Sequence, residues 1–228
     1  MSPPQRPDAA RLARALRQHV QGLRAFGAAE TPRAPAQPGT GSGKEVQLQQ
    51  LADDVAQCRA CPLYRTRTKP VVSDGSPHAK LMFIGEAPGR DEDQQGVPFV
   101  GAAGQLLTKM IQAMGLKRED MYICNVLKDR PPGNRLPEPE EVAACWPFLE
   151  RQIAIIKPLV ICVLGAVAAK TLLGPHVAIT KIRGQTMDFH GIPVIPTFHP
   201  AYLLRNPAAK PMTWDDLKRV MALLKELA

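Results

Sequence analysis

Residues 81–107 read LMFIGEAPGRDEDQQGVPFVGAAGQLL, and this stretch decides the fold class. It opens with a short apolar run, Leu81–Gly85, that is typical of a buried strand. A loop rich in Gly and Pro follows, and residues 104–114 have the apolar spacing of a helix. The loop lacks the Gly-Lys-Ser/Thr of a P-loop and the glycine spacing of a dinucleotide-binding motif. We therefore exclude both of these nucleotide-binding classes.

The alternation of strand and helix continues to the end of the chain. Strands are expected at residues 81–85, 121–127, 159–164 and 192–196, and helices at residues 46–57, 104–114, 138–156, 166–173 and 214–227. Such alternation favours a parallel sheet with helices on both faces. We predict an α/β fold, a three-layer αβα sandwich around a central, mainly parallel four-stranded sheet.

The N-terminal part of the chain differs in composition from the rest. Residues 1–26 carry apolar side chains at helical spacing, which predicts a short amphipathic helical segment. Residues 27–45 are rich in Pro, Ala and Gly and are expected to form a flexible linker. The globular domain is expected to span residues 46–228.

Charge and composition narrow the partners and the compartment. The 228 residues carry a formal net charge of +8, which suits either a polyanionic partner or a solvated basic surface. No apolar run approaches the roughly 20 residues that cross a bilayer, so no membrane partner is expected. The N-terminus lacks the apolar core of a secretory signal, and we predict a cytoplasmic protein.

Polar side chains follow three of the predicted strands. Glu86 comes directly after the first strand, Asn125 lies near the end of the second, and His199 follows the fourth. Ligands bind at the carboxyl ends of parallel strands, so we expect these side chains to meet. A lone histidine is more often structural than catalytic, but His199 lies on a strand-end loop, where functional residues concentrate.

Four motifs together carry a resemblance to a known family. They are GEAPG…PFVG…GQLL from Gly85, NVLKDRPPGNR from Asn125, CWPFL from Cys145 and HPAYLLR from His199. The chain resembles the family 4 uracil-DNA glycosylases over about Gln47–Ala228. That resemblance implies a DNA repair enzyme that hydrolyses the N-glycosidic bond of uracil in DNA and leaves an abasic site.

The resemblance implies a role for each pocket residue. A glycosylase extrudes its target base and reads it in a closed pocket. Phe99 is expected to stack on the base, and the Asn125 amide to match the N3–H donor and O4 acceptor of uracil. His199 is expected to stabilise the departing anion at O2. Glu86, with the following Ala87, is expected to position water and offset positive charge on the sugar. A core aromatic and a strand-end turn residue are the structural alternatives for Phe99 and Asn125.

Other residues are candidates for specificity and for DNA contact. Glu92 is a candidate for rejecting the methyl group of thymine. An apolar wedge beside a cation is expected to fill the gap left by the flipped nucleotide and bind a phosphate, and it comprises Tyr202, Leu203, Leu204 and Arg205. A polar loop suited to backbone contacts contains Lys128, Arg130, Asn134 and Arg135. Solvated surface is the alternative for both groups.

The cysteines raise the question of a metal. Five cysteines, an odd number, argue against a disulfide framework, and Cys58 and Cys61 form a C-x2-C pair. The resembled family holds a [4Fe–4S] cluster through four cysteines, which places three ligands at Cys58, Cys61 and Cys145. Asp129 occupies the fourth position, although thiolates normally hold such clusters.

Three outcomes follow from this departure. Asp129 binds iron through oxygen, Cys124 substitutes for it, or the cluster has three irons or is absent. We expect a structural [4Fe–4S] cluster with three cysteine ligands and Asp129 as the candidate fourth ligand. Cys162, inside an apolar run, is expected to be an inert buried thiol.

Two other functions stay open. A covalent uracil-DNA binder of the related cluster-containing type shares the first motif, but residues 127–137 lack the histidine that such proteins carry there. A non-enzymatic DNA-binding accessory module, tethered through residues 1–26, is the alternative from another class. We expect a monomer whose partner is uracil-containing DNA, with a protein partner for the N-terminal segment.

Overall fold

The computed structural model describes residues 43–228, so the predicted helix at 1–26 and most of the predicted linker lie outside the described residues. The first described helix, α2, spans Lys44–Gln57. Lys44 and Glu45, the last two residues of the predicted linker, thus lie in this helix. The Nζ atom of Lys44 donates to the carbonyl of Ile156 at 2.7 Å, which ties the start of α2 to the domain.

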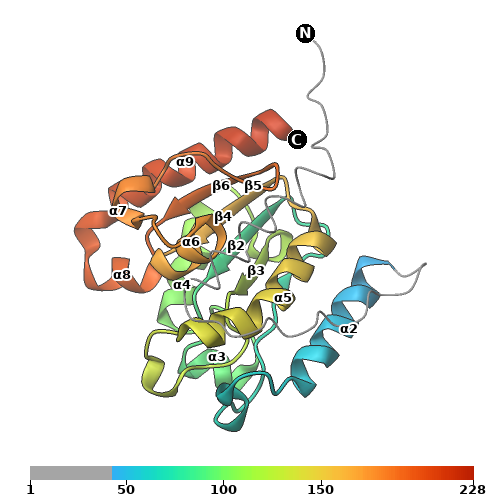
Figure 1. Cartoon of the computed structure of the whole chain (residues 1–228). Coiled ribbons are helices and arrows are strands. Elements are labelled where there is room, and N and C mark those ends of the chain that lie inside the picture. Colours follow the sequence, from blue (N-terminus) through green and yellow to red (C-terminus); the bar gives the residue numbers. More distant parts are fainter. Residues whose placement is uncertain (1–42) are drawn as a thin grey trace.

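A six-stranded sheet forms the centre of the domain (Figure 1). Its strand order is β1-β3-β2-β4-β6-β5. The inner strands are parallel to one another, and they are β2 (Leu81–Gly85), β3 (Tyr122–Asn125), β4 (Val160–Leu164) and β6 (Ile192–Thr197). Strands β2, β3 and β4 are buried throughout, as their continuous apolar runs predict. The predicted α/β fold with a parallel four-stranded core is confirmed.

The sheet has two more strands than predicted. β1 (Asp74–Gly75) pairs with β3, and β5 (Met187–Phe189) pairs with β6, both antiparallel. With two and three residues, these edge strands are too short to carry a readable alternation of apolar and polar side chains.

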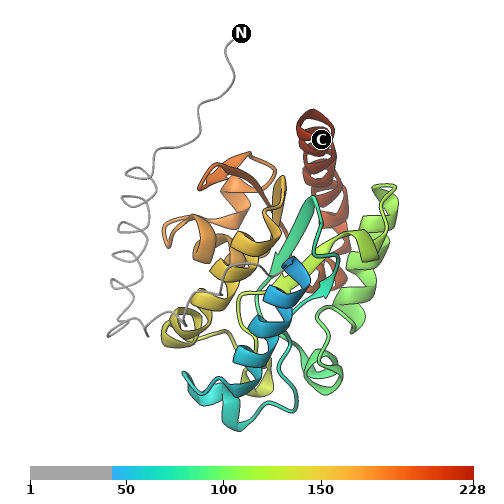
Figure 2. The same ribbon diagram turned by 90° about the vertical axis from the view of Figure 1, so that its right-hand side faces the viewer.

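Helices cover both faces of the sheet and complete the three layers. One layer is formed by α5 (Pro139–Ile156) and α6 (Ala166–Leu173), the other by α4 (Ala102–Ala113) and α9 (Lys210–Leu227). Neighbouring residues of β2 face opposite layers: Ile84 packs in the core cluster with α5 and α6, and Phe83 in the cluster with α4 and α9. Figure 2 shows the sheet between the yellow α5 on one side and the red α9 on the other.

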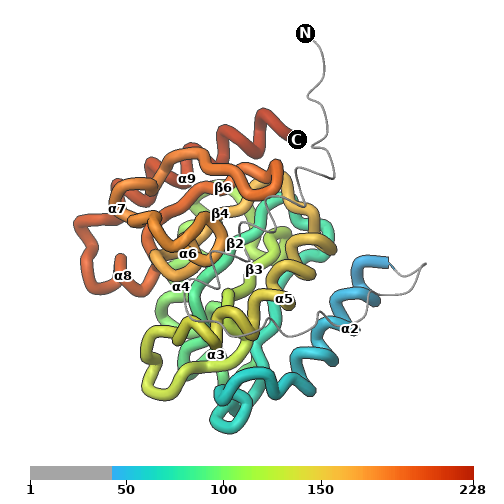
Figure 3. The backbone as a smooth tube through the Cα atoms, in the orientation of Figure 1, coloured from blue at the N-terminus to red at the C-terminus, as the bar shows by residue number. Residues whose placement is uncertain are grey.

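Shorter elements complete the chain. α2 packs beside α5 although the two helices are far apart in the sequence (Figure 3). The other short helices are α3 (Arg90–Gln95), α7 (Ile179–Ile182), α8 (Pro200–Arg205), η1 (Pro62–Arg65), η2 (Arg118–Asp120), η3 (Pro132–Asn134) and η4 (Pro207–Ala209). Within residues 43–228, no helix combines the length and apolar character needed to cross a membrane.

Candidate active site

The carboxyl ends of the parallel strands meet at one cavity. Gly85 at the end of β2 is the register partner of Asn125 at the end of β3. His199 follows β6 by two residues. A cavity of about 530 Å³ opens here, a size that suits a small ligand, and its lining includes Glu86, Asn125 and His199. The structure therefore brings together the three side chains that the strand ends predict.

The side chains of Phe99 and Asn125 lie very close to the backbone of Gly85. A Cβ atom at position 85 would lie 2.4 Å from Cζ of Phe99 and 2.4 Å from Oδ1 of Asn125. Phe99 adopts the left-handed conformation with φ 55°, which is uncommon for a residue with a side chain and is often found at functional sites. Its ring lies against that of His199, with 5.6 Å between ring centroids.

The side-chain oxygen of Asn125 has no hydrogen-bond partner among residues 43–228. Asn125 is buried, and its Oδ1 accepts no hydrogen bond from any described residue. An unsatisfied buried acceptor is costly to folding, so such atoms usually mark a bound water, ion or ligand. The cavity is therefore suited to a ligand whose N–H or O–H group donates a hydrogen bond to Oδ1 of Asn125.

His199 is held in one tautomer by the helix that follows it. It is the N-cap residue of α8, and its Nδ1 atom accepts a hydrogen bond from the backbone N–H of Ala201 at 3.1 Å. Because Nδ1 is an acceptor, the proton of the neutral ring is on Nε2. Burial lowers the pKa of His199 to about 4, so the ring is a neutral donor at physiological pH.

Glu86 and Ala87 line the same cavity directly after β2. Burial raises the pKa of the Glu86 carboxyl, and no neighbouring cation among the described residues offsets this effect. The small side chain of Ala87 leaves room for a ligand beside the carboxylate. Glu86 is thus a carboxylate whose charge is destabilised by its surroundings and which a positively charged reacting group would stabilise.

Glu92 holds the loop that carries Phe99. Its Oε1 atom accepts hydrogen bonds from the backbone N–H groups of Val100 and Gly101, both at 2.9 Å. These two residues directly precede α4, so the carboxylate lies at the positive end of that helix. Gly89 lies so close that a Cβ there would be 2.6 Å from Oε2 of Glu92. Glu92 lines the cavity, but its carboxylate is already bound to the backbone.

The expected DNA-contacting segment of α8 divides into a buried and an exposed part. Leu203 is 1% exposed and packs with Phe198 and Ala209, so the structure contradicts its role as a wedge. Leu204 and Tyr202 are exposed by 45% and 39%. Both lie on the surface beside the cavity, which Tyr202 lines.

The polar loop after β3 also divides. Lys128 is buried, and its Nζ atom donates to the backbone oxygen of Asn125 and to Oε1 of Gln152, each at 2.6 Å. It is therefore not available to DNA, contrary to expectation. Asn134, Arg135 and, from α8, Arg205 line the cavity. Arg135 also pairs with Glu141 at 2.6 Å, and Arg130 donates to Asn134 at 2.7 Å.

Comparison with known proteins decides the family. The family model of the uracil DNA glycosylase superfamily matches residues 72–218, which contain every residue of the cavity. The chain belongs to this superfamily. Its similarity to curated type-4 uracil-DNA glycosylases extends over most of its length. The chain is 46% identical to that of Thermotoga maritima over 187 residues, which cover 80% of this chain and 97% of the relative.

Two archaeal relatives have the same name. The type-4 uracil-DNA glycosylase of Sulfurisphaera tokodaii is 44% identical over 77% of this chain and 84% of its own length. That of Archaeoglobus fulgidus is 42% identical over 76% of this chain and 91% of its own length. The similarity thus covers nearly the whole of each relative.

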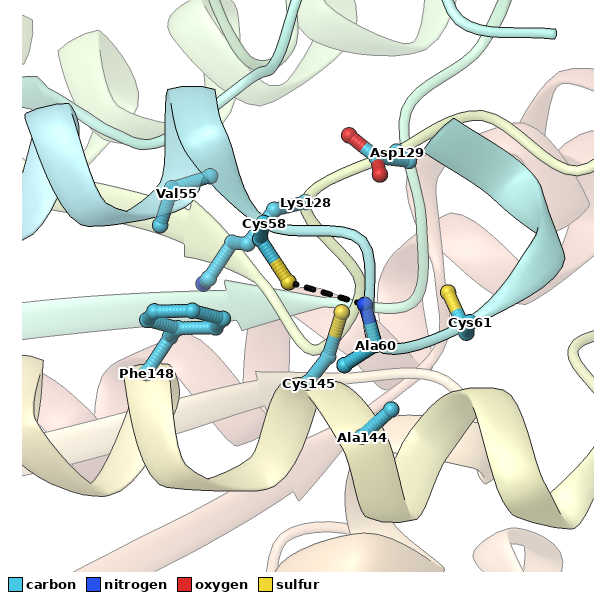
Figure 4. A pocket seen from close by; sticks show the side chains of 9 residues that line it. All are labelled: Val55, Cys58, Ala60, Cys61, Lys128, Asp129, Ala144, Cys145 and Phe148. Carbon is cyan, nitrogen blue, oxygen red and sulfur yellow. Dashed lines mark hydrogen bonds between the residues drawn. The ribbon is translucent and has the colours of Figure 1, made fainter. Parts of the chain in front are cut away.

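This member of the uracil DNA glycosylase superfamily has a second, smaller cavity, and three of its five cysteines line it (Figure 4). Cys58 follows α2, Cys61 precedes η1, and Cys145 lies in α5. Asp129, after β3, lines the cavity across from α5. Cys58 Sγ accepts a hydrogen bond from the backbone N–H of Ala60 at 3.5 Å. The three thiols and the carboxylate that the sequence singles out therefore share one site.

The donor set of this cavity fits an anionic cluster. Within residues 43–228, no three His, Cys, Asp or Glu side chains converge on a position for a single metal ion. A cluster spreads its ligands over several irons, so three thiols around one cavity fit a cluster better than a single ion. Lys128 lines the cavity and donates to two neutral acceptors; burial lowers the pKa of its amine, and thiolate ligands nearby would favour its charged form.

The other two cysteines lie outside this cavity. Cys124 is fully buried in β3, and burial raises the pKa of its thiol to about 11. Cys162 is fully buried in β4, and burial raises its pKa as well. Neither lines the cavity, so Cys124 does not supply the missing ligand, and Cys162 is the buried thiol that its apolar run predicts.

Arg67 was not predicted from the sequence as a site residue. Its Nη1 atom lies 3.0 Å from Oδ1 and 3.0 Å from Oδ2 of Asp129. A buried carboxylate is stable only when it is paired, so burial of Asp129 would indicate that a cationic partner exists. Residues 59–69 contain several basic side chains, however, and nothing in their spacing selects Arg67.

Proposed function

We propose that this protein is a DNA repair glycosylase that extrudes uracil from DNA and hydrolyses its N-glycosidic bond, leaving an abasic site. The observation that carries the proposal is that Oδ1 of Asn125, in the cavity, has no hydrogen-bond partner in the described part of the chain. The N3–H of uracil donates to this oxygen, and the Asn125 amide group donates to O4. Cytosine presents an acceptor at N3 and a donor at N4, so it mismatches the same amide.

The bound base stacks on Phe99. The hydrogen bonds from Val100 and Gly101 to Glu92 fix the backbone directly after Phe99. The ring is thereby held against Gly85 before the base enters, so little ordering is needed on binding. Glu92 acts in this proposal as a positioning residue for the stacking ring.

His199 stabilises the leaving group. Breaking the glycosidic bond places negative charge on uracil, and the Nε2–H of His199 donates to O2 as that charge develops. The Ala201 N–H fixes the tautomer, so the donor is in place before the bond breaks. A donor that is preorganised in this way requires no reorientation in the transition state.

Glu86 acts on the sugar side of the bond. The sugar gains positive charge as uracil leaves, and an ionised Glu86 offsets that charge and orients the attacking water. Burial makes the carboxylate costly in the free protein, so its interaction with the cationic sugar is favourable in the transition state. Ala87 keeps space for the water and the sugar.

DNA is bound at the rim of the cavity. Leu204 and Tyr202 are the exposed groups that fill the gap in the base stack. Arg205 and Arg135 bind the flanking phosphates, in agreement with the net charge of +8. We place the protein in the cytoplasm as a monomer, with uracil-containing DNA as substrate and a protein partner for residues 1–26.

The small cavity holds a [4Fe–4S] cluster through Cys58, Cys61 and Cys145 in this proposal. When bound, the cluster supplies a structural cross-link. The thiols join the segment after α2 to α5, two parts of the chain that are distant in sequence. Asp129 stands at the sequence position where the resembled family has its fourth cysteine.

A gel assay on oligonucleotides that contain one uracil tests the function. The purified protein is expected to produce abasic sites, which alkali converts to strand breaks. A heat-stable protein–DNA adduct would instead indicate a covalent binder, and binding without either product a DNA-binding module. Glu86→Ala and His199→Ala are expected to abolish cleavage. His78→Ala, at a largely exposed histidine, is the matched control and is expected to cleave normally.

A further inference from the structure

Arg67 and Asp129 form an ion pair beside the cysteine cavity. The two residues are 62 positions apart in the sequence, and Nη1 of Arg67 lies 3.0 Å from each carboxylate oxygen. Their side chains are exposed by only 12% and 6%. A pair that is withdrawn from water to this extent leaves a buried unpaired charge when either partner is lost.

Arg67 also binds the end of α2. It donates to the backbone oxygens of Val55, at 3.2 Å, and of Ala56. Carbonyls in the last turn of a helix carry its negative partial charge, so a guanidinium suits them. Arg67 thus fastens the segment that delivers Cys58 to the loop that begins at Asp129.

The ion pair and the expected cluster join overlapping parts of the chain. The cluster joins the Cys58–Cys61 segment to α5, and a fourth ligand at position 129 would add the loop after β3. The Arg67–Asp129 pair already makes this last connection. For Asp129 to bind iron with full charge donation, its carboxylate would have to leave Arg67 buried and unpaired.

We propose that the Arg67–Asp129 ion pair replaces the fourth cluster ligand as a structural connection, so that Asp129 binds Arg67 and not iron. A bound cluster would then have three protein ligands, all cysteines. The first part, that the ion pair is a structural connection, is independent of the proposed cluster. The second part, that Asp129 does not bind iron, rests on the proposed cluster. The ion pair fastens the loop to α2 with or without iron.

Thermal denaturation of iron-free protein tests the first part independently of glycosylase activity. Wild type, Arg67→Gln, Asp129→Asn and the double variant are stripped of iron with a chelator and compared. Each single substitution is expected to lower Tm. The double variant is expected to lose less than the sum of the two, because no charge is left unpaired. Additive losses would overturn the proposal.

Asp54→Asn is the matched control for this experiment. It breaks the ion pair of Asp54 with Arg151, 2.7 Å apart, which also fastens α2 but shares no partner with Arg67. Its loss of Tm is expected to add to that of Arg67→Gln. Non-additivity here would show that the coupling is not specific to Asp129, and would count against the proposal.

Spectra of the anaerobically loaded protein test the second part. Asp129→Asn is expected to keep the visible and electron paramagnetic resonance spectra and the iron count of wild type. Asp129→Cys adds a thiolate, so its spectra are expected to change. Asp129→Asn spectra that differ from wild type, with an unchanged Tm of the stripped protein, would identify Asp129 as an iron ligand. Iron-free preparations of all variants would contradict the proposed cluster, while the Tm coupling still decides the ion pair.

Discussion

The backbone N–H of Ala201 donates to Nδ1 of His199 at 3.1 Å, which fixes the imidazole as an Nε2–H donor directed by the start of α8. A single backbone contact thus sets both the tautomer and the orientation of an imidazole that lines the cavity. The neighbouring Phe99 ring, with its centroid 5.6 Å away, restricts the imidazole from another side.

His199 makes the stability of the protein depend on pH. Its pKa is about 4 in the folded protein, lowered from 6.5 by burial. As pH falls below about 6.5 the unfolded chain binds the proton first, so the free energy of unfolding decreases down to about pH 4. Between pH 7.5 and 5 this decrease is expected to be about 1–2 kcal/mol.

Urea denaturation of wild type and His199→Gln at both pH values measures this contribution. The glutamine variant has no titrating ring and is expected to lose less stability on acidification than wild type. An equal loss in both proteins would show that His199 titrates normally in the folded state.

Glu86 is expected to set the acid limb of the excision rate. Its carboxyl has to be ionised to offset charge on the sugar, and burial raises its pKa above the ordinary 4.5. Because His199 stays neutral down to about pH 4, the rate is expected to fall as pH drops through the pKa of Glu86. Single-turnover excision rates across pH give this profile.

The variant Glu86→Gln tests whether the acid limb of the excision rate is due to the Glu86 carboxyl. It is expected to lower the rate at pH 7.5 by about 100-fold or more, and to remove the acid limb that the Glu86 carboxyl sets. Glu119→Gln changes an exposed glutamate and is expected to follow the wild-type profile. A limb that persists unchanged in Glu86→Gln would assign it to another group.

Glu92 is expected to contribute to both stability and excision. Glu92→Ala removes the acceptor of two backbone N–H groups at the start of α4, at an expected cost of about 1–3 kcal/mol. The loop that carries Phe99 loses its anchor, so the substrate KM is expected to rise. Glu92→Gln keeps an oxygen acceptor and is expected to retain more of both properties. Thermal denaturation gives the stability of each variant, and steady-state kinetics gives its KM. Equal stability and equal KM in the two variants would contradict the role of Glu92 as the acceptor of these hydrogen bonds.

The parallel core and the meeting of the strand ends were predictable because fully buried strands leave continuous apolar runs. Leu81–Gly85 is such a run, and its end places Glu86 in the cavity. The edge strands β1 and β5 have no such signal. Helix α8 was also missed, although His199 followed by Pro200 is a recognisable helix start, with an N-cap and a proline at the first position.

The sequence did not predict which single residues within the motifs are buried. Leu203 and Leu204 are neighbours in one motif, yet only Leu203 is buried, against Phe198 and Ala209. Lys128 and Asp129 lie in a polar loop that reads as surface, yet both are buried because they meet partners from distant segments, Gln152 and Arg67. Such pairings depend on tertiary contacts that no local pattern contains.

The recognition of uracil by Asn125 is tested most directly by Asn125→Asp, in single-turnover excision from an oligonucleotide with one uracil. The carboxylate keeps the acceptor for N3–H, but it cannot donate to O4 and repels it. The proposed pocket predicts abasic product from wild type and a rate at least about 100-fold lower for the variant, which corresponds to about 2.7 kcal/mol. Equal excision by the two proteins would contradict the proposed role of Asn125.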